Sequence, residues 1–237
     1  MKLKTPVNKT ILRHHIAYNF WKYILLVVFS VFIVDMLYTT TAYRVPESKR
    51  IDVYIQGTLS TQEHIDQLFE RMRTDLLPEV EVIRSAFLLS DSQNEMYAAQ
   101  QLTTYLAVGE GDLYILQAED YKRYASQGVF ADLGVAIDEG QLDVLDLDLS
   151  GGFVAMQEYD AEKNALNTIG EKRLYGIPTA GLPGLNSEFG IINQNSYISM
   201  TVFNGNDVKV LSFLNSLIGR TYEEKEVVPA TTQGNHP

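Results

Sequence analysis

The stretch that decides the fold reads Asp112-Leu113-Tyr114-Ile115-Leu116-Gln117, an apolar run of strand length that a helical stretch from Glu119 to Gln127 follows directly. Gly128 stands one residue past that stretch, where helices commonly end in a left-handed conformation. A strand that leads at once into a helix is the repeating unit of a parallel sheet. These residues therefore predict one β-α unit of an α/β domain.

The same order occurs twice upstream of this unit. Residues 51–55 are predicted to form a strand, and Ser60 and Glu63 fit a capping box for a helix that Pro78 ends. Residues 80–89 predict a second strand, and Asp91 can cap a helix that runs to about residue 106. Three such units predict the α/β class, with a parallel or mixed sheet, helices on both faces and right-handed crossovers.

The chain after residue 133 departs from this order. Residues 134–172 are rich in Asp and Gly without one clear period, and we expect a small insertion or a reduced second lobe there. Strands are expected at 173–178 and 188–192, and a final helix at 207–218. The α/β domain is thus expected to comprise residues 51–133 and 173–220, with a disordered tail at 221–237.

An apolar run, Ile24 to Val34, predicts one transmembrane helix over residues 21–43. It separates a basic N-terminus, residues 1–20, from a short stalk, residues 44–50. The basic residues before the run outnumber acidic ones, which predicts a cytoplasmic N-terminus and an extracellular C-terminal domain at the cell membrane; they are Lys2, Lys4, Lys9, Arg13 and Lys22. A cleaved secretory signal is the alternative, since a basic lead and a short apolar core fit it as well.

Asp35 is the acidic residue of the predicted membrane helix. A carboxylate inside a bilayer is costly and often functional. Its place toward the outer end of the helix favours contact with water. The helix lacks a small-x-x-x-small pattern, so nothing in it favours homo-oligomerisation.

The charge balance bears on the partners of the extracellular part. Residues 1–43 hold five of the 19 basic residues and one of the 30 acidic ones, which leaves residues 44–237 with a formal net charge of −15. Such a domain is repelled by nucleic acid and by anionic lipid headgroups, so a nucleic-acid partner is excluded. The chain has no cysteine, so it uses no disulfide framework.

Two motifs carry a resemblance to a known family. Gly111 to Leu116, followed by Gln127-Gly128-Val129-Phe130-Ala131-Asp132-Leu133, resembles an element of the extracellular solute-binding proteins of ABC importers. Leu174-Tyr175-Gly176-Ile177-Pro178 is similar to the segment by which that family returns from its second lobe to its first. The resemblance covers about residues 50–134 and 172–219, and only residues 134–172 take the place of the second lobe. The membrane segment also looks like those of uncharacterised single-pass proteins of Gram-positive bacteria.

The resemblance implies a membrane-anchored, extracellular solute-binding-like module that is not an enzyme and is accessory to an ABC-type transporter. The alternative is a degenerate binding fold that serves as a structural or protein-interaction module at the cell surface. The expected partners are the lipid bilayer, through one span, and a transporter or another cell-surface protein. Whether a small-molecule ligand binds stays open, and no cofactor is expected.

Ligands of open parallel sheets bind beyond the carboxyl ends of the strands. The candidate ligand-binding residues there are Gly57, Thr58, Ser90, Asp91 and Gln117, and Tyr175 and Gly176 would face them from the return segment. Small hydroxyls, amides and helix N-termini would suit anions or carboxylates. The alternative for Asp91 is that it only caps a helix.

No catalytic or metal site is predicted. Hydrolysis by a Ser-His-Asp group needs a base, yet His64 is the only histidine of the expected core and no G-x-S-x-G elbow is present. The acidic group Asp143, Asp146 and Asp148 is the only metal candidate. It lacks the glycine and the terminal glutamate of an EF-hand, so a solvated acidic loop is favoured.

Overall fold

The structure is a computed structural model, and it describes residues 9–88, 95–160, 165–202, 205 and 207–222. The chain divides into two compact units, residues 1–44 and 45–237. Each unit is described by itself below.

The first unit is one long helix, α1 (Lys9–Thr41). Within its residues Ala17–Thr41, an 18-residue window has a mean hydropathy of 2.1 and is nowhere buried, so by length and composition this part of the helix can cross a membrane. The helix kinks at Asn19, whose backbone leaves the helical region and whose amide donates a hydrogen bond to the His15 carbonyl oxygen at 3.2 Å. The predicted span, residues 21–43, lies almost wholly within this apolar part.

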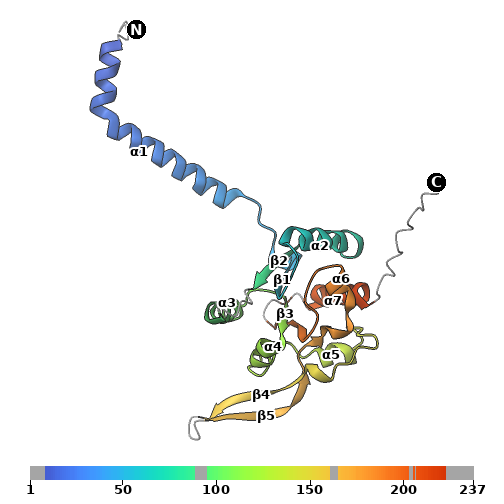
Figure 1. The fold of residues 1–237 in the computed structure, drawn as a ribbon. Helices are drawn as coiled ribbons and strands as arrows, with labels where there is room; N and C mark the ends of the chain where they lie inside the picture. The colour runs from blue at the N-terminus through green and yellow to red at the C-terminus, as the bar shows by residue number, and fades with distance from the viewer. Residues whose placement is uncertain (1–8, 89–94, 161–164, 203–204, 206, 223–237) are drawn as a thin grey trace, which may run out of the picture. The chain divides into compact units, whose positions relative to one another are not determined.

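The second unit is built on a five-stranded sheet (Figure 1). Its strands are β1 (Arg50–Gln56), β2 (Val82–Leu88), β3 (Leu113–Gln117), β6 (Ile177–Pro178) and β7 (Ser196–Met200). The order across the sheet is β2-β1-β3-β7-β6, and β7 runs antiparallel to both of its neighbours. The predicted α/β class with a mixed sheet is confirmed.

Helices cover both faces of the sheet because successive side chains of a strand point to opposite faces, and those of β1 and β3 are largely hydrophobic on both. On one face Ile51, Val53 and Ile55 of β1 pack with α2 (Gln62–Leu76), α5 (Leu133–Asp138), α6 (Pro183–Ser187) and α7 (Asp207–Tyr222). On the other face Tyr54 and Tyr114 pack with α3 (Glu95–Ala107) and α4 (Ala118–Ala125). Gly128 follows α4 with φ at 73°, as the sequence predicts.

The segment expected as an insertion contains α5, the short helix η2 (Ser150–Gly152) and part of a hairpin of β4 (Phe153–Asp160) and β5 (Ala165–Leu174). The hairpin strands pair with each other in a separate two-stranded sheet and extend away from the main sheet (Figure 1). The Gln157 amide donates to the Ser126 carbonyl oxygen at 2.8 Å, which ties β4 to the end of α4.

Several expected boundaries differ in the structure. Residues 188–192 do not form a strand, because Gly190 adopts φ at 64° and leaves Ile191 only an isolated bridge to Thr58. The strand lies later, in β7, where all five residues are buried. Helix α2 is capped by Thr61, whose hydroxyl accepts from the His64 amide at 3.4 Å, and not by Ser60.

The ends of the second unit also differ from the expected limits. In the segment expected as a stalk, η1 (Glu47–Lys49) leads directly into β1, and Arg50 is paired in register with Val82. Lys49 makes an ion pair with Glu81 at 2.6 Å. This ion pair connects the residue before β1 with the residue before β2. At the other end α7 continues through Tyr222, and residues 223–237 of the expected tail lie outside the described part.

Candidate functional site

Four parallel strands of the sheet end at one edge. β1, β2, β3 and β6 run in the same direction, so Gln56, Leu88, Gln117 and Pro178 lie along the carboxyl edge of the sheet. This edge is where ligands bind in open α/β sheets. The candidate site is therefore sought along it.

Gln56 organises the middle of this edge. Its side chain is 5% exposed; its Oε1 accepts from the Gln117 amide at 2.9 Å, and its Nε2 donates to Asp120 Oδ2 at 2.8 Å. These two bonds connect the end of β1 to the start of α4. Asp120 was not among the predicted site residues, although its place one helical turn after Gln117 was a usable signal.

Gly57 and Thr58 lie next to Gln117 but are covered by their own chain. A Cβ atom on Gly57 would lie 3.2 Å from the Gln117 Nε2, and the Gly57 carbonyl oxygen accepts from the Ile192 amide at 2.9 Å. The Thr58 hydroxyl donates to the Gly190 carbonyl oxygen at 3.2 Å. The segment once expected as a strand thus closes over the end of β1, and the polar groups here are already engaged.

Tyr175 and Gly176 lie away from this group. They precede β6, and Ile177 is paired with Ile198, so both stand toward the amino end of the parallel strands. Tyr175 is buried, and a Cβ atom on Gly176 would lie 2.6 Å from the Tyr121 ring. The structure therefore brings Gly57, Thr58 and Gln117 together but not Tyr175 and Gly176. Ser90 and Asp91 lie outside the described residues.

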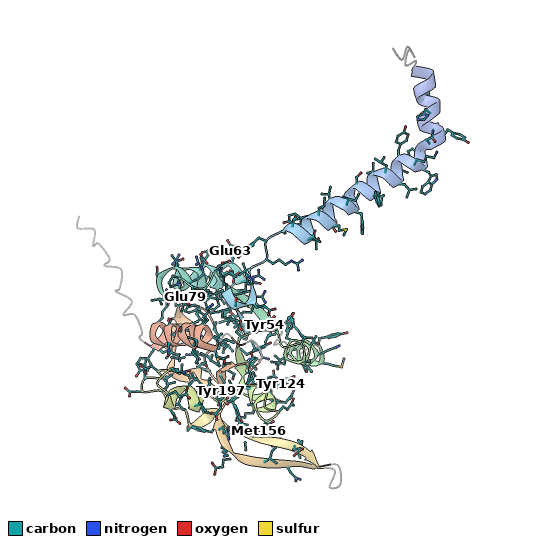
Figure 2. The ribbon with its side chains drawn as sticks, turned by 180° about the vertical axis from the view of Figure 1, so that it is seen from behind. Tyr54, Glu63, Glu79, Tyr124, Met156 and Tyr197 are labelled. Atoms are coloured by element: carbon teal, nitrogen blue, oxygen red, sulfur yellow. The ribbon has the colours of Figure 1, made fainter. Side chains whose placement is uncertain are left out.

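A layer of tyrosines supports the edge from the α3 and α4 face. Tyr54 stacks on Tyr114 with ring centres 5.0 Å apart, and Tyr121 stacks on Tyr197 at 4.3 Å; Figure 2 shows Tyr54, Tyr124 and Tyr197 on this side of the domain. Burial raises the pKa of the hydroxyls of Tyr54, Tyr114 and Tyr121 above the usual tyrosine range. These hydroxyls therefore stay neutral and serve as packing and hydrogen-bonding groups.

A groove opens at the carboxyl end of β6, the edge strand of the sheet. It has a volume of about 680 Å³, within the usual range for small-molecule sites. Its walls come from two segments, 146–151 and 178–183, and from the end of α7; the residues are Asp146, Leu147, Asp148, Ser150, Gly151, Pro178, Ala180, Gly181, Pro183 and Tyr222. A Cβ atom on Gly151 would lie 2.8 Å from the Tyr197 hydroxyl oxygen, so glycine allows the close approach of this wall.

The polar groups of the groove are carboxylates and hydroxyls. Asp148 Oδ1 accepts from the Ser150 amide at 2.9 Å, and this hydrogen bond lowers the pKa of Asp148. Asp146 and Tyr222 contribute a second carboxylate and a phenol. No Lys or Arg belongs to the lining residues. The groove thus offers acceptors to hydroxyl or ammonium groups and nothing positive to an anion.

The residues weighed for metal binding and catalysis have other roles. Asp143 Oδ1 accepts from the Leu145 amide at 2.9 Å, so Asp143, like Asp148, closes its own turn. Across the described part of the chain, no group of three His, Cys, Asp or Glu side chains could hold a metal ion. His64 Nε2 lies 3.1 Å from the Glu188 carbonyl oxygen, at an exposed position.

Solute-binding proteins are similar to part of this chain in structure. An extracellular solute-binding protein family 1 from Alicyclobacillus acidocaldarius subsp. acidocaldarius DSM 446 is 19% identical, with a TM-score of 0.37, over 55% of this chain and 28% of that chain. The ABC substrate-binding protein Lmo0181 from Listeria monocytogenes, in complex with cycloalternan, is 21% identical, with a TM-score of 0.33, over 54% of this chain and 28% of that one. No protein-family model matches the sequence, and no curated protein does.

The chain therefore spans little more than a quarter of the length of these two proteins, and the likeness concerns the fold alone.

Proposed function

We propose that this protein is a membrane-anchored, non-catalytic binding module. In this account α1 crosses the cell membrane once with its N-terminus in the cytoplasm, and residues 45–237 lie outside the cell. The apolar helix Ala17–Thr41 and the basic residues before it support this orientation. The proposed partner of the anchored module is an ABC-type transporter, as the resemblance of residues 111–133 implies.

The observation that carries the proposal is the groove at the end of β6. It lies at the edge of the sheet where open α/β folds bind ligands, and its floor and rim combine apolar residues with a few polar groups, as ligand sites do. Leu147, Pro178 and Pro183 supply apolar surface, while Asp148 and Tyr222 supply acceptors and a donor.

The charge of the groove selects the ligand class. Asp146 and Asp148 face it without a basic residue among the lining groups, and residues 44–237 carry a formal net charge of −15. An anionic ligand would be repelled by both. We therefore expect a neutral polyhydroxylated ligand, such as a sugar, or a ligand with an ammonium group, and not the anion that the strand-end loops first suggested.

A thermal-shift screen of residues 45–237, which carry their own hydrophobic core, tests the proposal. Sugars, amines, amino acids, peptides and organic anions would be the probes. A ligand at about a hundred times its Kd stabilises the native state by ~2.7 kcal/mol. The proposal predicts a hit among sugars or amines that Asp148→Asn weakens and that Asp138→Asn, a matched change at an exposed position of α5, leaves intact.

A second candidate function, a protein-interaction module, is favoured by two observations. The end of β1 is filled by the chain itself, through Gly190 and Ile192. Helix α3 exposes Met96 and Tyr97, at 74% and 62% of their surfaces. This second function would be supported if the folded domain binds no probe of any class and if Met96→Gln and Tyr97→Gln weaken its association with purified membrane proteins.

A further inference from the structure

Asp35 is the acidic side chain in the outer half of the apolar part of α1, and no hydrogen bond or ion pair joins it to another described residue. The hydroxyls around it behave differently. Ser30 donates to the Leu26 carbonyl oxygen and Thr40 to the Met36 carbonyl oxygen, both at 2.8 Å. These two hydroxyls are thus satisfied within the helix, whereas the carboxylate has no partner among the described residues.

The depth of Asp35 follows from the length of the helix, on the proposed membrane-spanning function of α1. If Lys22 marks the inner boundary, a hydrocarbon core of ~30 Å and a rise of ~1.5 Å per residue place the outer boundary near residue 42. Asp35 then lies roughly 10 Å below the outer surface. Its carboxylate is one methylene from the backbone, so it cannot reach the interface as a Lys or Arg side chain can. At this depth the contact with water that the sequence favoured is therefore replaced by burial in the outer half of the bilayer.

Within the described helix α1, no basic side chain lies at the depth of Asp35. The nearest basic residues along the chain are Lys22, about 20 Å away along the helix axis, and Arg44, which lies three residues beyond the end of α1. A second copy in the same orientation would bring another Asp35 to the same level, which adds a like charge. A complementary charge at this depth would therefore come from a different protein.

We propose that the Asp35 face of α1 is a recognition surface for a transmembrane helix of another protein that carries a Lys or Arg in the outer half of its span. Charged residues inside membranes pair with one another and face a protein interior. Side chains one turn to either side, Val31, Phe32, Tyr38 and Thr39, share this face and would pack against the partner helix. The occupant is a basic membrane helix, not a lipid and not a second copy of this chain.

The depth of Asp35 can be measured directly, because the chain has no cysteine. Single substitutions Asp35→Cys, Ser48→Cys and Thr5→Cys in the full-length protein would be treated with a membrane-impermeant maleimide on intact cells. We expect Ser48→Cys to label from outside and Thr5→Cys only after the membrane is opened. Asp35→Cys should label only after detergent is added. Labelling of Asp35→Cys as fast as Ser48→Cys would overturn the inference, whereas failure of Ser48→Cys to label from outside would overturn the proposed topology instead.

Pairing is tested in phosphatidylcholine vesicles with the full-length protein and synthetic probe helices. One Leu-rich probe carries a single Lys at the depth of Asp35, and a second carries Leu there. Energy transfer should report association about tenfold stronger with the Lys probe. Asp35→Leu should remove the difference, and Thr40→Leu, whose hydroxyl bonds within the helix, should keep it. Equal binding of both probes, or self-association of the full-length protein that depends on Asp35, would overturn the proposal.

Discussion

Gly152→Ala is expected to destabilise the domain strongly, because Gly152 joins the insertion to the sheet without room for a side chain. A Cβ atom there would lie 1.9 Å from the Gly176 carbonyl oxygen and 2.8 Å from Leu174 Cδ1. The backbone would have to open by about 1.1 Å before the first contact reached 3.0 Å, the shortest that real Cβ atoms show. The clash meets backbone, so no side-chain rotation can relieve it.

The magnitude follows from the contacts that this movement disturbs. Overpacking of a tight interior costs ~1–3 kcal/mol. The Gly152 carbonyl oxygen also accepts from the Tyr121 hydroxyl and, at 3.2 Å, from the Tyr175 amide, and weakening such a bond costs ~1 kcal/mol. We therefore expect a loss of about 2–4 kcal/mol in the free energy of unfolding.

Urea unfolding of residues 45–237, followed by far-ultraviolet circular dichroism, is the assay. Gly219→Ala is the matched control, since a Cβ atom on Gly219 in α7 meets nothing within 4 Å. Alanine should stabilise that helix by ~0.5–1 kcal/mol. If Gly152→Ala unfolds within 0.5 kcal/mol of the unchanged protein, taken as a rough limit of surface effects, the packing described at this junction is wrong.

Three further predictions follow from the site. Gln56→Leu should cost about 2–3 kcal/mol because it leaves the Gln117 amide and Asp120 without their partner, while Gln117→Ala, an exposed side chain, should change stability little in the same urea assay. Ser199→Ala should be neutral or slightly stabilising, since the buried Ser199 hydroxyl oxygen has no hydrogen-bond partner among the residues that the structure describes; a clear loss of stability would reveal a partner. The carboxyl of Asp148 should titrate below the usual aspartate range by NMR, so its small stabilising contribution holds above the ordinary pKa and disappears as pH falls through the lowered one. Ser150→Pro, which removes both the donor amide and the hydroxyl that lower this pKa, should return it toward normal, and an unchanged titration would contradict the assigned cause.

Local signals in the sequence were sufficient for the α/β order. The alternation in residues 113–116 places Leu113 and Ile115 on one face and Tyr114 and Leu116 on the other, as the two cores of the structure have it. The proximity of Gly57 and Gln117 was predictable too, because both follow neighbouring parallel strands. These features depend on residues close in sequence or on one general rule of sheet topology.

Long-range packing decided what the sequence could not predict. Strand β7 was missed because its buried positions include Ser196 and Ser199, whose polarity hid a central strand, while Gly190 lay inside a more apolar segment that turns instead. The groove was not predicted because it depends on contacts between distant parts of the chain. Its walls, residues 146–151 and 178–183, are far apart in the chain, and neither has a periodic pattern that predicts their contact.

The measurement that tests the binding-module account most directly is an NMR titration of residues 45–237 with the sugar or amine that stabilises them most. The account predicts that the largest amide shifts fall on Ser150, Gly151 and Gly181 in the groove, and that Gly57 and Thr58, already bonded to residues 190–192, barely change. Shifts that gather elsewhere on the domain, or no saturable shift with any sugar or amine, would contradict it.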